Sequence, residues 1–438
     1  MRLYDIVFYS AIFFMVGIVF ASFRINGFFI LLVSFVVFLL FLALSLFKRS
    51  GFMIGRPLAV GCLAFFIIIG AFYYHLFFVL QNENIVFNKE IDFHGLIVND
   101  PKIGINNQEF LIEIQPPFKG KIKVYSNVYP SWQYGDILSF NGEIRKTSRG
   151  KNILSFPEME LVKRNTGSDF KFFLYELRQS MSGNLNKVLP SSSAALINGI
   201  LFGETKRFDS DFKDALIETG TIHIVALSGY NVLIITLGVS SLFSYFSSRR
   251  KSFYLTILAV LGFVLMTGAE PSTVRAAIMG ILVLTAKQMS RLSNLRNSVT
   301  LTAFSMTLFN PNFLVFDLGF QLSFLALLGI VYFEPKIKKI LKFGDEEGFF
   351  GWKKNFLTTI SAQLGVLPLL LLEFGRFSWF SFLPNILILN VIPITMLFGF
   401  LTAVSGFISN FLAVIIGLIL NILLRYEIGV INIFSYLF

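Results

Sequence analysis

Long apolar runs alternate with short polar connections over most of the 438-residue chain. A helix that crosses about 30 Å of hydrocarbon needs roughly 20 mostly apolar residues. We interpret the first run as a retained span, because no convincing small-residue cleavage site follows it. The pattern predicts a polytopic α-helical membrane protein with about eleven spans, near 4–23, 28–47, 57–80, 221–246, 252–269, 272–288, 298–316, 318–333, 355–372, 380–400 and 403–424, and a short apolar tail after Arg425.

A polar stretch at 85–163 interrupts this pattern and alternates apolar with polar positions in short segments. Such alternation, with turn residues in the breaks, predicts β-strands. A set of this size suggests an inserted small antiparallel barrel, most simply an OB-like one. The expected strands are Asp92–Asn99, Glu109–Gln115, Lys121–Tyr125, Ile137–Gly142, Asn152–Phe156 and Met159–Lys163.

Residues 164–220 carry apolar side chains at helical spacing, which predicts an amphipathic helical segment on the outer side of the membrane. The chain then divides into four parts. They are N-terminal transmembrane helices at 1–84, the extracytoplasmic β domain at 85–163, the amphipathic segment at 164–220, and a transmembrane domain at 221–438.

Charge adds a topology to this picture. Only 14% of the residues are charged, the formal net charge is +11, and the Lys and Arg residues concentrate in alternate connections between spans. This positive-inside pattern places the protein in the inner (plasma) membrane with its N-terminus in the cytoplasm and residues 81–220 outside. Because topology explains most of the basicity, the charge alone does not indicate a nucleic-acid partner. The single cysteine, Cys62, excludes an intramolecular disulfide.

Polar residues inside a span usually line a cavity or pair with each other, because they are costly in lipid. The densest set runs from Thr219 to Asn231 and includes His223, Ser228 and Gly229. On a regular helix Ser228 lies about 140° from His223, so helix geometry alone does not bring them together. The Ser-Gly-Tyr-Asn step either opens the helix onto a cavity or makes a close helix contact, and the cluster alone favours neither.

Two further polar sets lie on the outer halves of neighbouring spans. Arg275 follows Pro271 at the start of one span, and Asp317 and Gln321 share a face at the start of another. Arg275 and Asp317 are expected at the same depth, which allows an ion pair between them. Snorkelling of Arg275 to the interface and a purely structural Asp317 clasp are the alternatives.

These three sets together resemble a known family. The stretch His-Ile-Val-Ala-Leu-Ser-Gly-Tyr-Asn-Val, the helix Pro-Ser-x-x-Arg-Ala-x-x-Met at 271–279 and the run Asp-x-Gly-Phe-Gln-Leu-Ser-Phe at 317–324 are similar to the signatures of ComEC-type DNA-internalisation competence proteins. The lead-in at 195–204 is similar too, and the resemblance covers essentially the whole chain. It implies translocation of single-stranded DNA across the cytoplasmic membrane during natural transformation, with the seven polar positions lining the channel: His223, Ser228, Gly229, Asn231, Arg275, Asp317 and Gln321.

The sequence departs from that family in two places. Members often carry histidine where this chain has Asn231, which puts an imidazole function there in doubt. Many also continue into a metallo-β-lactamase-like nuclease domain that needs a His-x-His-x-Asp-His metal cluster. This chain holds only His75, His94 and His223, far apart. We therefore expect a short form that is not an enzyme, with no cofactor and no metal.

The β domain offers candidate DNA contacts. Three lysines alternate on one predicted strand face, four basic residues cluster in a loop, and aromatic residues lie near them in sequence as stacking platforms. Across 85–163 there are ten Lys/Arg against nine Asp/Glu, so a solvated strand face is an equal alternative for the lysines. The candidates are Lys119, Lys121, Lys123, Tyr125, Trp132, Arg145, Lys146, Arg149 and Lys151, with Tyr129 and Tyr134 nearby.

The expected partners are single-stranded DNA and membrane lipids, with an outer DNA receptor, a separate nuclease and a cytosolic ATP-driven helicase or translocase. A motor is required because no Gly-x-x-x-x-Gly-Lys-Ser nucleotide-binding motif occurs. A homo-oligomer is compatible with the sequence. Three alternatives stay open: a transporter or flippase for another polar polymer or lipid, an intramembrane hydrolase that uses Ser228 and His223, and an assembly scaffold without a conduit.

Overall fold

The computed structural model describes residues 3–23, 29, 32–39, 63–81, 84–104, 106–147, 152–205, 208–225, 229–288, 295–342, 352–374 and 382–437. The chain forms two compact units. One contains residues 1–82 and 281–331, and the other contains residues 83–280 and 332–438. The predicted division into four parts stays a prediction.

The first unit contains a closely packed helix pair, α1 (Leu3–Ser22) and α4 (Phe66–Gln81). Two glycines let the backbones touch. A Cβ on Gly17 would lie 1.9 Å from the backbone oxygen of Ile67, and one on Gly70 would lie 2.0 Å from that of Phe14. Small residues at such contacts are the usual device for helix association in lipid. The predicted span at 28–47 lies mostly outside the described residues.

Helix α12 (Leu295–Phe309) packs on α1 in the same unit. The Phe14 and Phe304 rings meet edge to face at 5.2 Å, and Arg296 forms an ion pair of 3.5 Å with Asp5. The predicted span at 298–316 is interrupted after Phe309, where Pro311 cannot continue the hydrogen-bond ladder. The chain resumes as the short helix α13 (Asn312–Phe316).

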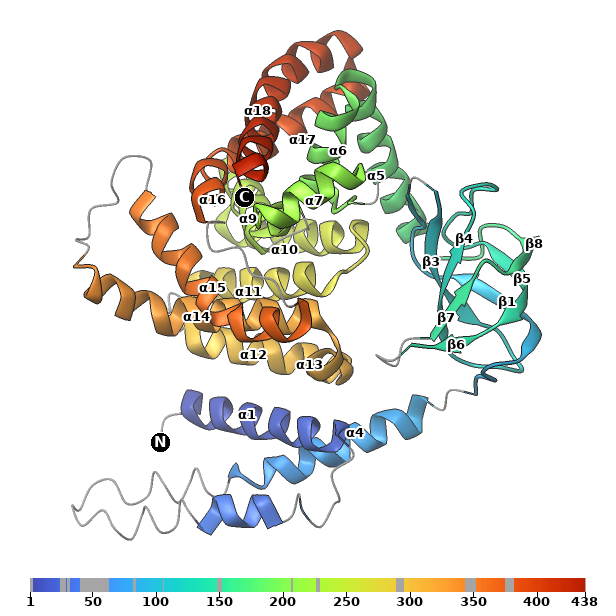
Figure 1. The fold of residues 1–438 in the computed structure, drawn as a ribbon, viewed down its shortest axis with the longest axis vertical. Coiled ribbons are helices and arrows are strands. Elements are labelled where there is room, and N and C mark those ends of the chain that lie inside the picture. Colours follow the sequence, from blue (N-terminus) through green and yellow to red (C-terminus); the bar gives the residue numbers. More distant parts are fainter. Residues whose placement is uncertain are drawn as a thin grey trace. The chain divides into compact units, whose positions relative to one another are not determined.

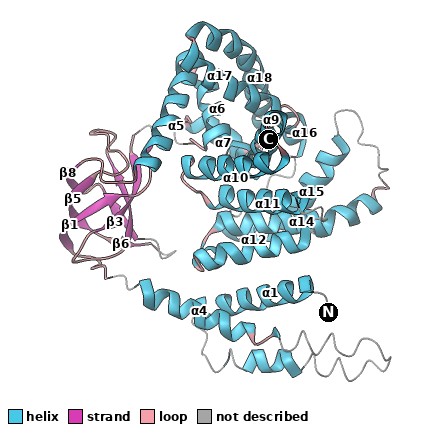
Figure 2. Cartoon of the chain, turned by 180° about the vertical axis from the view of Figure 1, so that it is seen from behind, coloured by secondary structure: helices cyan, strands magenta, loops and turns pink. Residues whose placement is uncertain are grey.

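The polar stretch folds into a β domain with its own core in the second unit (Figure 2). The sheet order is β6-β7-β4-β3-β1-β5-β8, and β2 pairs with β3. All six predicted strands are present, but the sheet is mixed rather than antiparallel, because β4 and β7 run parallel. Closure into a barrel stays a prediction. The strands are β1 (Glu90–Ile97), β2 (Lys102–Ile103), β3 (Gln108–Ile114), β4 (Lys121–Ser126), β5 (Ile137–Glu143), β6 (Arg145–Lys146), β7 (Asn152–Ser155) and β8 (Glu158–Lys163).

Alternation fixes the register of this sheet. In β4 the burial of Ile122, Val124 and Ser126 alternates with more exposed lysine and tyrosine side chains. Period-two burial of this kind places one strand face on a core and the other toward solvent. The charged and aromatic candidates at 121–125 therefore share the outer face, as the sequence predicts.

A helical bundle makes up the rest of the second unit (Figure 1). Helices α11 and α14 cross the boundary between the two units. The helices are α5 (Asp169–Val188), α6 (Ser191–Phe202), α7 (Ser210–Glu218), α8 (Ile222–Val225), α9 (Gly229–Phe246), α10 (Arg249–Met266), α11 (Pro271–Gln288), α14 (Leu318–Ile340), α15 (Trp352–Phe374), α16 (Phe382–Leu389), α17 (Ile392–Ile408) and α18 (Asn410–Leu437).

The segment predicted to lie amphipathically on the outer side contains a helix that is buried instead. Helix α6 packs against α5, α17 and α18, and nine of its twelve residues are buried. Leu196, Ile197, Ile200 and Leu201 are almost inaccessible. A helix that is apolar on nearly every side is stable only inside a bundle, and α6 is of that kind.

The last two predicted spans have wrong boundaries. The helix breaks fall at residues 390–391 and at Ser409, not between 400 and 403. Pro393 sits in the first turn of α17, and Ser409 adopts an extended backbone that ends it. Helix α18 then runs through Arg425 to Leu437, where a separate tail was expected.

Several helices are long and apolar enough to cross a membrane. Among the described residues there are five, or six if the pair 383–389 and 392–408, bent by 46°, forms one span. Shorter apolar helices lie at 66–80, 191–202 and 271–285. The protein is a multi-pass membrane protein, and the count of about eleven spans stays a prediction.

Candidate functional site

The dense polar stretch contributes residues to two described helices, one on each side of positions 226–228. Helix α8 ends at Val225, and α9 begins at Gly229. Residues 226–228, including the candidate Ser228, lie outside the described residues. Both alternatives for the Ser-Gly-Tyr-Asn step, an opened helix and a close helix contact, therefore stay predictions.

Asn231 links α9 to the rest of the bundle. Its side chain is 1% exposed, and Nδ2 donates to the carbonyl oxygens of Ile200 at 3.0 Å and Ile224 at 3.3 Å. One amide thus joins the first turn of α9 to α6 and to α8. The amide is turned toward backbone groups inside the protein, and a role for it as channel wall stays a prediction.

His223 is exposed, and its Nδ1 lies 2.8 Å from the carbonyl oxygen of Gly220. That contact holds the imidazole against the turn before α8. Because Ser228 is outside the described residues, the hydrolase alternative gains no geometric support here and stays a prediction.

Arg275 lies close to the start of α9. It is 7% exposed, and a Cβ placed on Gly229 would lie 3.3 Å from Nη2 of Arg275. The absence of a side chain at Gly229 therefore lets the guanidinium approach the backbone.

Asp317 and Gln321 form hydrogen bonds that stabilise the turn between α13 and α14. Asp317 Oδ1 accepts the Phe320 N–H at 2.7 Å, which is a helix N-cap. Gln321 Nε2 donates to the carbonyl oxygens of Leu314 at 3.2 Å and Val315 at 2.6 Å. These bonds match the alternative in which Asp317 has a purely structural role. Asp317 and Arg275 belong to different units, so their ion pair stays a prediction.

Glu427 is a buried acid that the sequence analysis missed. It lies on α18 with 1% exposure, and Thr395 Oγ1 donates to its Oε1 at 2.5 Å. A cavity of about 10 Å³ adjoins it, lined by residues of α6, α8, α16, α17 and α18. The signal was visible in the sequence: one acid inside a long apolar run marks a candidate site in a membrane protein.

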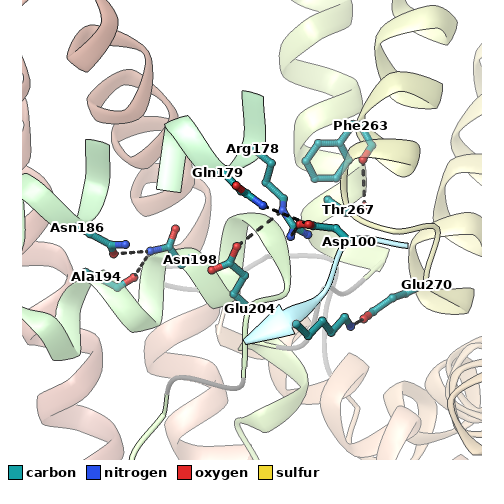
Figure 3. A network of polar contacts seen from close by, with 11 residues as sticks. Asp100, Arg178, Gln179, Asn186, Ala194, Asn198, Glu204, Phe263, Thr267 and Glu270 are labelled. Carbon is teal, nitrogen blue, oxygen red and sulfur yellow. Dashed lines mark hydrogen bonds and ion pairs between the residues drawn. The ribbon is translucent and has the colours of Figure 1, made fainter. Parts of the chain in front are cut away.

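A second polar cluster joins the β domain to the bundle (Figure 3). Arg178 on α5 forms an ion pair with Asp100, which follows β1, and its Nε lies 3.7 Å from Glu204 Oε1 after α6. Gln179 Nε2 also donates to Asp100, at 3.2 Å. The pair is almost fully buried. Burial raises the pKa of the Asp100 carboxyl; Arg178 opposes this rise, and the Glu204 charge adds to it.

The junction has three further contacts. The Tyr134 and Tyr175 rings meet edge to face at 5.2 Å, and Tyr134 accepts the Ser168 N–H at 3.1 Å. Lys102 of β2 forms an ion pair with Glu270, the residue before α11. The β domain is thus tied to the helix that carries Arg275, and Tyr134 is a packing residue rather than an open stacking surface.

The predicted basic strand face is balanced by acids. Lys123 Nζ lies 3.1 Å from Glu109 Oε2 and 5.1 Å from the centre of the Tyr125 ring. Lys121 is exposed and stands opposite Glu113 in the register of β3 and β4. Lys119 is exposed beside them. This arrangement favours the alternative in which the lysines form a solvated strand face over the one in which they contact DNA.

The other candidate DNA contacts are dispersed. Arg145 pairs with Glu143 at 2.7 Å, and Lys146 lies 5.7 Å above the Phe87 ring. Trp132 is largely buried in the core of the β domain, whereas Tyr129 is exposed. Arg149 and Lys151 lie outside the described residues.

No metal centre is formed within the described part of the chain. No group of three or more His, Cys, Asp or Glu side chains there is arranged to hold an ion.

Comparisons with known proteins gave one family match and one similar protein. Residues 200–437 match a family model described as Competence protein. The chain is 29% identical over 241 residues to ComE operon protein 3 of Bacillus subtilis (strain 168). That match covers 54% of this chain and 29% of that protein, so the chain matches less than a third of the relative's length. No solved structure gives a significant match.

Proposed function

Because the chain belongs to the competence protein family, we propose that it is a conduit for single-stranded DNA across the cytoplasmic membrane during natural transformation. The observation that carries the proposal is the span of the family match. It covers α9 and α11, which hold the buried polar side chains Asn231 and Arg275 among apolar residues. Polar groups in such a position usually serve a polar cargo or each other.

The electrostatics of this region suit DNA. Arg275 is largely buried beside Gly229, and its guanidinium charge favours an anion. Phosphates are anions, and guanidinium groups bind them well. The positive charge of Arg275 would attract the phosphate backbone of a passing strand without selecting its bases.

The β domain supports the same function from the outer side. Its junction with α5 and with the residue before α11 consists of buried or half-buried ion pairs. A strand held by the β domain would then meet a fixed path toward Arg275. In this proposal residues 81–220 are extracytoplasmic.

The proposal requires other proteins. A separate cytosolic motor would pull the strand, a separate nuclease would degrade its complement, and an outer receptor would deliver the duplex. The chain itself is proposed as a passage in the plasma membrane and not as an enzyme. Assembly of several copies is compatible with this role.

Uptake of labelled DNA tests the proposal. Cells that lack their own copy would carry this chain or its Arg275→Ala variant at equal protein level. We expect the wild-type chain to restore uptake and Arg275→Ala to reduce it at least about tenfold, since a lost charged contact costs about 1.5–3 kcal/mol. Arg275→Lys keeps the charge and should lose less.

Arg250→Ala is the matched control, because it removes an exposed arginine from the start of α10. Full uptake in Arg275→Ala would contradict a role for Arg275 in the passage. Asp317→Ala is a poorer probe, because it also removes the cap of α14. Photo-crosslinking to residues 119–147, with DNA as competitor, separates a DNA conduit from a transporter of another polymer.

A further inference from the structure

The β domain carries a pocket that the proposed function does not use. Its volume is about 190 Å³. It lies between the loop after β4 and the turn that joins β7 to β8. The lining residues are Ser126, Asn127, Tyr129, Pro130, Trp132, Phe156, Pro157 and Met159.

The chemistry of the lining points to an uncharged, flat ligand. None of the eight lining side chains is ionic. Two of them are aromatic and largely open to solvent, with Tyr129 83% and Phe156 58% exposed. Large aromatic side chains are usually buried, and exposed ones at a pocket often bind a partner.

The walls of the pocket are held in place from behind. Gln108 is fully buried, and its Nε2 donates to the carbonyl oxygens of Asn127 and Pro130, both at 2.7 Å. On the other wall, the Phe156 N–H donates to the Tyr125 carbonyl oxygen at 2.7 Å. A site fixed before binding loses less conformational entropy when a ligand enters.

Trp132 provides an unused hydrogen-bond donor at this pocket. Its side chain is 8% exposed, and Nε1–H has no hydrogen-bond partner among the described residues. Buried donors are nearly always paired, so an unpaired one calls for an explanation. A ligand acceptor that shifts the side chains over Nε1 would gain this bond.

We propose that the pocket receives one unpaired base of single-stranded DNA, stacked on Tyr129 or Phe156 with its polar edge toward Trp132. The proposal rests on the proposed function and adds to it the group that the β domain holds. Pockets for drug-sized ligands measure about 300–1,000 Å³, so this smaller one suits a single base. The phosphates would stay outside, which fits a lining without charge.

The test uses the fluorescence of Trp132 in the full chain. Trp352→Phe and Trp379→Phe remove the other two tryptophans of the sequence. An oligothymidylate is then titrated into the detergent-solubilised protein. An oligomer of equal length with abasic sites keeps the sugars and phosphates but lacks the bases. We expect quenching by the first and little by the second.

Tyr129→Ala and Phe156→Ala each remove one aromatic wall from that protein. We expect at least one of the two substitutions to weaken oligothymidylate binding about 5- to 150-fold, which is the range that one stacked base contributes. Phe170→Ala is the matched control, since this ring on α5 is 56% exposed and does not line the pocket. Circular dichroism checks that each variant keeps its fold.

Equal quenching by the abasic oligomer, or unchanged affinity in both wall variants, would overturn the pocket proposal. Quenching by a neutral glycan fragment and not by DNA would overturn it as well and would assign the pocket to a saccharide. The uptake assay decides the proposed function separately. If uptake is restored but quenching does not depend on the bases, the conduit proposal stands and the pocket proposal is wrong. If quenching depends on the bases but uptake is not restored, the pocket proposal stands and the conduit proposal is wrong.

Discussion

Arg178 and Asn231 are two buried polar side chains that hold elements together in different ways. Arg178 joins the β domain to α5 through carboxylates, at Asp100 and Glu204. Asn231 joins α9 to α6 and α8 through backbone carbonyls. A buried charge needs an opposite charge, whereas a neutral amide needs only acceptors. The junction should therefore be more sensitive than the bundle to the loss of one partner.

Arg178→Ala is expected to have the largest effect. It leaves the buried Asp100 carboxylate without its counter-ion, which costs about 3–5 kcal/mol. Thermal unfolding of the detergent-solubilised protein, followed by circular dichroism, measures the loss. The double variant Asp100→Asn with Arg178→Met should lose less than Arg178→Ala, because no unpaired charge remains. A loss below about 1 kcal/mol in Arg178→Ala would remove the contrast between the two regions.

Asn231→Leu should have a smaller effect on the same measurement. It removes two hydrogen bonds but buries no charge, and polar contacts between membrane helices contribute about 0.6–2 kcal/mol. Asn231→His keeps a ring donor and should fall between Asn231→Leu and the wild type. A loss in Asn231→Leu as large as in Arg178→Ala would contradict the comparison.

Glu427→Gln sharpens the contrast within the bundle. The amide oxygen of glutamine can accept the Thr395 hydroxyl, which now donates to Oε1, and its shape is nearly the same. We expect a change below about 1 kcal/mol in unfolding free energy. If uptake nevertheless falls while stability is kept, the carboxyl itself is needed for function.

Lys123→Ala is expected to have the smallest effect. Its ion pair with Glu109 is partly exposed, and exposed pairs contribute about 0–1 kcal/mol. Thermal unfolding of the variant should be close to that of the wild type. A change comparable with Arg178→Ala would show that the outer face of β4 is more shielded than its exposure indicates.

The sequence predicted the strands better than the helix ends. Alternation of period two identified all six principal strands, because strand burial follows directly from side-chain order. The end of α17 could not be located in the same way. The apolar run continues on both sides of Ser409. The break there depends on the extended backbone conformation of Ser409, which the hydropathy pattern does not indicate.

The polar sites show the same limit. The motif at 223–231 indicated a polar region within the apolar helices, but the bonds of Asn231 depend on Ile200 of α6, which lies 31 residues earlier. Arg178 and Asp100 are 78 residues apart, and neither belongs to a motif. Their pairing follows from the docking of a sheet on a helix, which single-residue patterns do not encode.

The glycine contact between α1 and α4 also has a consequence for biosynthesis. Both helices are complete once residue 81 has been made, but α12, which packs on α1 through Phe304, comes more than 200 residues later. At about 5–20 residues per second, translation needs roughly 10–45 s to cover that interval. Helices α1 and α4 can already pack on each other in the membrane during this time, because the backbone approach at Gly17 and Gly70 is available to them as soon as both are inserted.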